Sequence, residues 1–235
     1  MNNSPFKRIV KPNKEIILIP KSNKYDYVFI FMHGLFATPF NFVDKFDKYN
    51  GPIPDNFKII LPCAPVQNAD FNKGKPTTSW FNISAKYGGI IYEDCIDYNQ
   101  LKSSANKIEK ISHEEAKLLN GNYDKIFVSG FSQGSCLSFH IGLEFEYLLG
   151  GIVCFCGVPF SYTKINHKNK NLNIFAVLGG KDEFFQINFA KEQIKNLIGD
   201  FPNLIVKVYK PNGHQVYDDE LEDLKKFILD KELIH

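Results

Sequence analysis

The sequence predicts an α/β fold with a mostly parallel central sheet and helices on both faces. Short runs of consecutive apolar residues, typical of strands covered on both faces, recur along the chain. Longer helix-like stretches separate them, and strands that alternate with helices favour a parallel sheet. The length of 235 residues and the hydrophobic content of 44% fit one domain, residues 1–235, with a large core.

The apolar runs give the expected strands, in chain order. They lie at Glu15–Ile19, Tyr27–Met32, Phe57–Leu61, Lys125–Ser129, Gly151–Phe155, Asn173–Leu178 and Leu204–Tyr209. In such a sheet, ligands bind beyond the carboxyl ends of the strands, so the segments that follow these runs are the first places to look for a site.

The stretches between the strands give the expected helices, at Tyr92–Leu119, Ser135–Leu148, Asn188–Ile198 and Asp218–Leu229. Acidic residues at the start of the last stretch favour a helix N-terminus. No regular element is expected from Pro62 to about Gly89, a segment that holds the only tryptophan, Trp80. We expect this segment to face a ligand, because its apolar side chains would otherwise lie in solvent.

Composition and charge argue against several classes of protein. The formal net charge is +2 with no long block of one sign, which favours neither nucleic acid nor an anionic membrane surface as a partner. No run of about 18 apolar residues exists, and Met1–Lys14 lacks a secretory core, so we expect a cytoplasmic protein without stable membrane insertion. The sequence carries no indication of oligomeric state.

The five cysteines are expected to be reduced and structural. Their number is odd, and Cys154 and Cys156 lie two apart in an apolar run, which places them on one face of a strand. No spacing of cysteine and histidine matches a zinc site. We therefore expect neither a disulfide framework nor a bound metal.

The motif Gly130-Phe131-Ser132-Gln133-Gly134 lies between a predicted strand and a predicted helix, the context of a nucleophile elbow. Small residues two positions either side of Ser132 are needed because strand and helix come very close at such a turn. The turn also directs the Gln133 N–H at the start of a helix, where negative charge is favoured. The motif thus predicts a nucleophile and one oxyanion donor. Glycines and serines are common in loops, so the motif alone could arise by chance. The strand before it and the helix after it favour the nucleophile elbow.

Asp182 and His214 are the expected partners of Ser132. Each follows a late predicted strand, and the order Ser, Asp, His is the one this architecture uses. His214 would act as the base, and Asp182 would fix its tautomer. Glu183 is the alternative acid, while Asp218 and Asp219 are better explained as first-turn helix residues. No other histidine follows a late strand.

A second oxyanion donor is expected in the turn after an early strand. Met32-His33-Gly34-Leu35 follows the run that begins at Tyr27, and the Leu35 N–H is the candidate. Without the elbow, the same residues would be explained as a plain turn with a surface histidine.

Taken together, the motifs resemble the acyl-protein thioesterase and carboxylesterase family of α/β-hydrolases, over most of the chain. The likeness rests on segments that occur in the family's order: His33-Gly34-Leu35, Leu61-Pro62-Cys63-Ala64-Pro65-Val66, Ser79-Trp80-Phe81-Asn82-Ile83, Gly130-Phe131-Ser132-Gln133-Gly134-Ser135, Lys181-Asp182 and Gly213-His214. The resemblance implies an α/β-hydrolase fold, a triad of Ser132, Asp182 and His214, and oxyanion donors at Leu35 and Gln133. It implies hydrolysis of acyl esters or thioesters, in some members of S-acylated proteins or lysophospholipids, with no cofactor.

The sequence departs from the family's pattern in the walls of the site. Phe36-Ala37-Thr38 stands where the family commonly has Gly-Asp-Thr, and Glu183-Phe184-Phe185 replaces a stretch that contains proline. These changes leave the identity of the substrate open. We expect an acyl chain to contact aromatic side chains of the site, although each of them could instead belong to the core: Phe36, Phe40, Trp80, Phe81, Phe184 and Phe185. Two alternatives to a thioesterase are a lysophospholipase or general carboxylesterase, and a receptor on a hydrolase scaffold that does not turn over its ligand.

Overall fold

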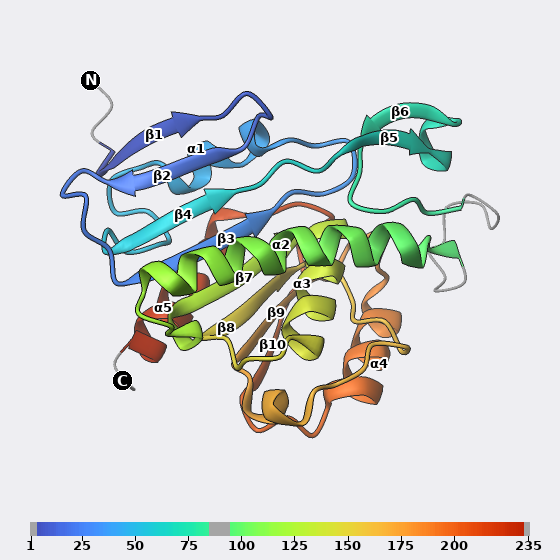
Figure 1. Cartoon of the computed structure of the whole chain (residues 1–235). Coiled ribbons are helices and arrows are strands. Elements are labelled where there is room, and N and C mark those ends of the chain that lie inside the picture. The colour runs from blue at the N-terminus through green and yellow to red at the C-terminus, as the bar shows by residue number, and fades with distance from the viewer. Residues whose placement is uncertain (1–3, 85–94, 233–235) are drawn as a thin grey trace.

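A computed structural model describes residues 4–84 and 95–232, and its main feature is a twisted sheet of eight strands (Figure 1). The strand order is β1-β2-β4-β3-β7-β8-β9-β10. Pairs β1–β2 and β2–β4 are antiparallel, and the six strands from β4 to β10 in this order are parallel. The strands are β1 (Phe6–Val10), β2 (Ile16–Pro20), β3 (Tyr27–Met32), β4 (Phe57–Leu61), β7 (Ile126–Phe131), β8 (Gly151–Phe155), β9 (Ile174–Gly179) and β10 (Leu204–Tyr209).

Helices cover both faces of this sheet, as predicted (Figure 1). On one face, α2 (Tyr98–Leu118), α3 (Gln133–Glu144) and α4 (Ile187–Ile198) pack against the sheet, and on the other lie α1 (Val43–Phe46) and α5 (Asp218–Glu232). Alternate side chains of β3 divide between the two cores, with Val28 and Ile30 on the α3 face and Phe29 and Phe31 on the α5 face. Short 3₁₀ turns lie at Pro39–Asn41, Asp70–Asn72, Tyr123–Lys125 and His167–Asn171.

The seven predicted strands and the four predicted helices are all present. Four of the strands have the predicted ends, and each of the other strands and of the helices is shifted at one end or both. Helix α3 ends at Glu144 instead of Leu148, because Phe145 turns to an extended backbone with ψ of 145°. The predicted helix Tyr92–Leu119 corresponds to α2, and its expected start at Tyr92 lies outside the described residues. The Asp97 side chain caps α2 by accepting a hydrogen bond from the Gln100 N–H.

Two parts of the sheet structure were not predicted. Strand β1 is antiparallel to β2 at the edge of the sheet, and its adjacent charged residues Lys7 and Arg8 hide it from a search for apolar runs. The prediction of an irregular segment after Pro62 is wrong for β5 (Val66–Ala69) and β6 (Lys75–Thr78), which form a separate hairpin. Its strands are short and polar, so they lack the apolar signal. The end of that segment, residues 85–89, lies outside the described part of the chain.

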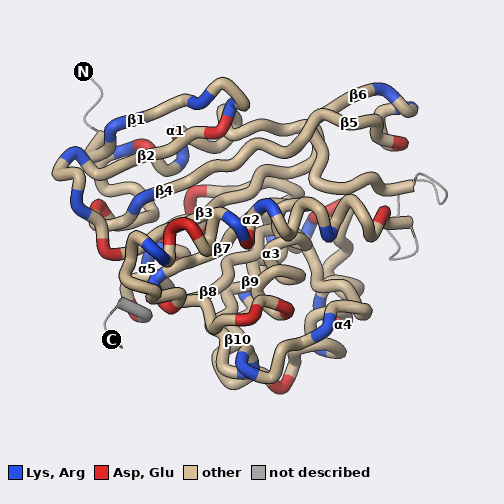
Figure 2. The backbone as a smooth tube through the Cα atoms, viewed as in Figure 1, with Lys and Arg blue, Asp and Glu red and all other residues tan. Residues whose placement is uncertain are grey.

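Charged residues of both signs are interspersed over the fold (Figure 2). Residues of both signs occur along α2 (Figure 2). Among the described residues, no helix has the length and apolar character needed to cross a membrane. All five cysteines are buried and free, as the sequence predicts.

Candidate active site

Ser132 lies at a sharp turn between β7 and α3, as the motif predicts. Its backbone has φ of 55° and ψ of −117°, a strained conformation for a residue with a side chain. A Cβ on Gly130 would lie 2.3 Å from the Gly134 carbonyl, and a Cβ on Gly134 would lie 2.2 Å from the Met32 carbonyl oxygen. Glycine is therefore required on both sides of the turn, because the backbones of strand and helix nearly touch.

Three side chains from three different loops meet at the carboxyl edge of the parallel strands. His214 Nε2 lies 2.9 Å from Ser132 Oγ, and His214 Nδ1 lies 2.8 Å from Asp182 Oδ2. A carboxylate can only accept, so Nδ1 donates to Asp182 and Nε2 keeps a free lone pair for the Ser132 hydroxyl. The Asp182 side chain is 1% exposed and that of His214 is 12% exposed. The order of the three groups is the one required for base-assisted attack by a hydroxyl.

Asp182 is itself held by the backbone that follows it. Its Oδ1 accepts hydrogen bonds from the N–H groups of Phe184 and Phe185, each 2.9 Å long. Both oxygens of the carboxylate therefore have partners: Oδ1 accepts from two backbone N–H groups of its own loop, and Oδ2 accepts from His214. Glu183, the alternative acid, is exposed and makes no such contact with His214 among the described residues.

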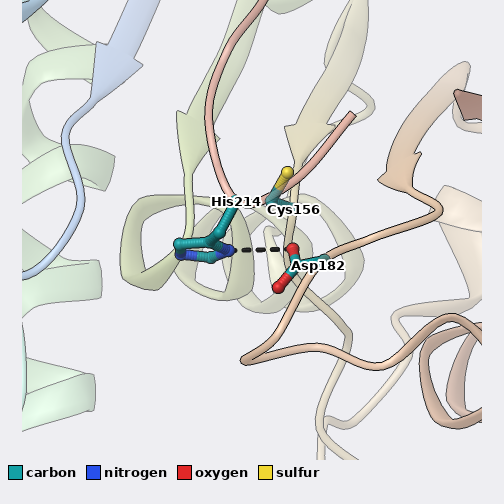
Figure 3. Close-up of side chains that lie close together, drawn as sticks. All are labelled: Cys156, Asp182 and His214. Carbon is teal, nitrogen blue, oxygen red and sulfur yellow. Dashed lines mark hydrogen bonds and ion pairs between the residues drawn. The ribbon is translucent and has the colours of Figure 1, made fainter. Parts of the chain in front are cut away.

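The Cys156 thiol lies behind the pair of Asp182 and His214 (Figure 3). Burial raises the pKa of Cys156, and the neighbouring charges of Asp182 and Glu220 raise it further. Ligand atoms of Cys156, Asp182 and His214 lie within 4.8 Å of one another, the one such cluster of three within residues 4–84 and 95–232. His214 Nδ1 and Asp182 Oδ2 are already joined by a hydrogen bond, and the Cys156 thiol keeps its proton. We therefore interpret the cluster as part of the hydrogen-bonded site and not as a metal site.

The candidate oxyanion donors flank Ser132. Leu35, Gln133 and Ser132 line the same cavity. In the described part of the chain, the N–H groups of Leu35 and Gln133 have no hydrogen-bond acceptor in the protein. Phe36, next to Leu35, has φ of 65°, a backbone conformation that favours glycine, and its N–H donates to the Thr78 carbonyl. This bond holds the turn so that the preceding N–H stays free.

His33 and Trp80 support this turn from below. His33 is buried, its Nε2 accepts from the Ala64 N–H at 3.0 Å, and its Nδ1 lies 2.8 Å from the Gly34 carbonyl oxygen. Trp80 Nε1 donates to the His33 carbonyl at 2.7 Å. Trp80 is fully buried and does not line the cavity, which differs from the expected contact with substrate. The indole instead holds the backbone of the turn from Met32 to Leu35 through its hydrogen bond to the His33 carbonyl.

The side chain of Gln133 has a role that the sequence did not indicate. Its Oε1 accepts from the Trp80 N–H at 3.0 Å, and its Nε2 donates to the Phe81 carbonyl at 2.7 Å. One buried amide thus fixes the segment of Trp80 and Phe81 to the start of α3. No motif rule distinguishes this use of Gln133 from a solvated side chain, because the partners are about 50 residues earlier in the chain.

The buried imidazole of His33 predicts a loss of stability in acid. The pKa of His33 is lowered from 6.5 to about 4, chiefly by burial and in part by the charge of Lys107, while the contact with the Gly34 carbonyl opposes the shift. The unfolded chain therefore takes up a proton between these two pH values that the folded chain does not. The free energy of unfolding should fall by up to about 3 kcal/mol as pH drops from 6.5 to 4. Urea unfolding at several pH values checks this, with His33→Gln as the variant that cannot titrate. Equal pH slopes for the two proteins would contradict the assignment.

A cavity of about 250 Å³ opens beside Ser132. Phe36 and Phe184 are half-exposed at its wall, 52% and 43%, while Phe81 is buried. Of the predicted contacts, these three and Phe185 line the cavity, whereas Trp80 and Phe40 do not. Several further liners were missed, because they come from segments far apart in the sequence: Phe71, Ile83, Ile96, Cys136 and Phe160. Apart from Ser132, Gln133 and His214, the walls are apolar.

Comparison with known proteins gives a family match and several related chains. Residues 13–231 match the model of the family described as Phospholipase/Carboxylesterase. The chain is 27% identical over 211 residues to acyl-protein thioesterase 1 of Eremothecium gossypii, with 86% of each chain covered. It is 30% identical over 189 residues to acyl-protein thioesterase 1 homolog 2 of Dictyostelium discoideum, which covers 78% of this chain and 82% of that protein.

Solved structures show the same fold. The crystal structure of acyl-protein thioesterase 2 of Zea mays superposes with a TM-score of 0.75, at 19% identity, and covers 93% of this chain and 99% of that one. At this identity the likeness is evidence of the fold, which is the α/β-hydrolase fold that the motifs imply.

Proposed function

This chain belongs to the phospholipase/carboxylesterase family and is a serine hydrolase of ester or thioester bonds, and on that premise we propose that Ser132, His214 and Asp182 are its catalytic triad. The observation that carries the proposal is the pair of short contacts from His214, 2.9 Å to the hydroxyl and 2.8 Å to the carboxylate. We propose acyl thioesters, including S-acylated proteins, as the substrates. A cytoplasmic location stays a prediction of the sequence.

The proposed reaction transfers an acyl group in two steps. Ser132 Oγ attacks the carbonyl carbon while His214 Nε2 takes the hydroxyl proton, and Asp182 stabilises the imidazolium that forms. The N–H groups of Leu35 and Gln133 hold the oxygen that becomes negative. His214 then returns the proton to the departing thiol or alcohol, and an acyl-serine remains. Water, deprotonated by His214, hydrolyses the acyl-serine and restores the hydroxyl.

The apolar cavity favours an acyl chain over a polar substrate. Ser132 lies among aromatic side chains, and only the groups of the proposed reaction interrupt the apolar wall. A lysophospholipid or a simple ester carries the same kind of chain, so both stay as alternative substrates. A receptor that does not turn over its ligand would be expected to use the same cavity without any need for the free N–H groups of Leu35 and Gln133.

Turnover of a thioester separates these alternatives. The purified chain is given octanoyl thioester, octanoyl ester and lysophosphatidylcholine, and release of thiol, alcohol and fatty acid is measured. We expect multiple turnovers, with kcat/KM highest for the thioester. Binding without release of product would contradict the proposed function. Faster cleavage of the lysophospholipid than of the thioester would identify the chain as a lysophospholipase instead.

The cavity also predicts a preference for chain length. Each methylene that the cavity removes from water is worth at most about 0.8 kcal/mol, so burial of the extra methylenes of octanoyl thioester should raise its kcat/KM over that of acetyl thioester, by up to about 10³-fold. Phe81→Ala should reduce the octanoyl rate and leave the acetyl rate within about twofold, because the ring lines the apolar cavity, where it packs edge-on against Phe160.

Phe40→Ala is the matched control for this preference, because Phe40 is exposed and lies outside the cavity. A series of acyl thioesters from two to sixteen carbons measures the effect in all three proteins. A series that peaks at acetyl in the unmodified protein would remove the assigned role of the cavity.

A further inference from the structure

Glu220 is a fully buried carboxylate that the proposed reaction does not use. It lies in the first turn of α5, and both of its oxygens accept hydrogen bonds. Oε1 accepts from Asn212 Nδ2 at 2.9 Å, and Oε2 accepts from the Tyr217 N–H at 3.2 Å. An ionised side chain in the interior is costly unless such donors face it, so its position needs an explanation.

The two donors lie on either side of His214 in the sequence. Asn212 comes two residues before it and Tyr217 three residues after it. One carboxylate therefore ties together both ends of the short loop that carries the imidazole. The bond to the Tyr217 N–H is ordinary for a residue near a helix start, where N–H groups lack partners. The hydrogen bond from Asn212 plays no part in capping the helix, because Asn212 lies in the loop before the helix.

The same loop is joined to the loop that carries Asp182. The Asn212 carbonyl accepts from the Lys181 N–H at 2.8 Å, and the Gly213 N–H donates to the Tyr217 hydroxyl at 3.1 Å. A Cβ on Gly179 would lie 2.7 Å from the Gly213 carbonyl oxygen, so the two loops are in close contact. Asn212 is thus bonded through its backbone to the Asp182 loop and through its side chain to Glu220.

We propose that Glu220 is a positioning residue for His214, which holds the loop from Asn212 to Tyr217 so that the imidazole stays in line with Ser132 and Asp182. This inference rests on the proposed function. Glu220 does not touch the hydroxyl, the substrate or the imidazole. It acts through Asn212 and Tyr217, by limiting the positions that the loop can take. Reaction rates depend strongly on such alignment, so a small displacement of His214 has a large cost.

The protonation state of Glu220 changes the strength of its hydrogen bonds to Asn212 and Tyr217 near neutral pH. Burial raises the pKa of Glu220 to about 7, the neighbouring Asp219 raises it further, and the bonds from Asn212 and Tyr217 and the charge of Lys45 lower it. Lys45, from α1, also donates to the Val216 carbonyl of the same loop. Two further titratable side chains are influenced by the charge of Glu220, Cys156 directly after β8 and Tyr209 of β10. Above pH 7 both oxygens of Glu220 accept, whereas the protonated acid has only one oxygen that is a good acceptor.

Three variants test the proposal in the full chain. Glu220→Ala removes both bonds, Glu220→Gln keeps one oxygen acceptor at nearly the same volume, and Glu222→Gln removes an exposed carboxylate from the same helix as the matched control. For each protein, octanoyl thioester turnover gives kcat and KM. A fluorophosphonate counts the competent sites, so that kcat is expressed per labelled site.

We expect Glu220→Ala to lower kcat per labelled site by at least about tenfold with KM within about twofold, and Glu220→Gln to lose less. Glu222→Gln should match the unmodified protein. The ratio of kcat between the unmodified protein and Glu220→Gln should rise several-fold from about pH 6 to about pH 8, because only Glu220 gains an acceptor over that range.

Some results would overturn the positioning role. A purely structural role would reduce the number of labelled sites and leave kcat per site unchanged. A kcat ratio that does not vary with pH, or an equal loss in Glu222→Gln, would also overturn it. If the unmodified protein neither labels nor turns over, the proposed function fails first and the positioning role fails with it. If it does both and the Glu220 variants match it, only the positioning role fails.

Discussion

Ser132→Ala should lower kcat for octanoyl thioester by about 10⁶-fold, because the Ser132 hydroxyl forms the acyl intermediate of the proposed reaction and the groups of a triad act as a unit. KM should change little, since the apolar cavity that binds the chain is unaltered. The measurement is turnover at saturating thioester, with product followed long enough to detect very slow release.

Ser138→Ala is the matched control for this substitution. Ser138 lies in the same helix, and its hydroxyl donates only to the Gly134 carbonyl one turn earlier. Its loss should leave kcat within about twofold. Retention of more than about a tenth of the activity by Ser132→Ala would refute the assignment of the nucleophile.

Asp182→Asn should lower kcat by about 10⁴-fold, because it leaves the imidazole in the wrong tautomer. The geometry explains which way the amide would turn. Oδ1 of Asp182 accepts from two backbone N–H groups, so the asparagine carbonyl should take that place and the NH₂ group should face His214 Nδ1. Nδ1 must then accept, the proton moves to Nε2, and Nε2 loses the lone pair that takes the Ser132 proton.

Glu183→Gln is the control for this second substitution, because it removes the neighbouring exposed carboxylate. Its kcat should stay within about twofold of the unmodified protein. If Glu183→Gln lost activity and Asp182→Asn kept it, the acid would be Glu183, the alternative that the sequence leaves open. The folded state of both variants is checked by thermal unfolding.

The parallel sheet and the positions of the three side chains of the proposed triad could be predicted because their signals are local. An apolar run marks each central strand, and Ser132, Asp182 and His214 each follow such a run at the edge where ligands bind. A prediction for residues at the ends of parallel strands requires no knowledge of side-chain packing. The hairpin of β5 and β6 carried no such signal, because its strands are short and exposed.

The support of the site could not be predicted, because it depends on contacts between distant residues. Trp80 was expected in contact with substrate, but the indole is buried and bonded to the His33 carbonyl. The sequence shows that a tryptophan in a loop needs cover and does not show which side provides it. Glu220 likewise has the pattern of a first-turn helix acid, and only the fold brings Asn212 to its second oxygen.

The central claim is that Ser132 is an activated nucleophile at the rim of the apolar cavity, and a fluorophosphonate tests it most directly. The unmodified protein is incubated with the probe, digested, and the modified peptide is sequenced by mass spectrometry. The account predicts one modification per chain, on Ser132, with a rate that falls sharply in His214→Ala. Modification of a different residue, or equal labelling of Ser132 with and without His214, would contradict it.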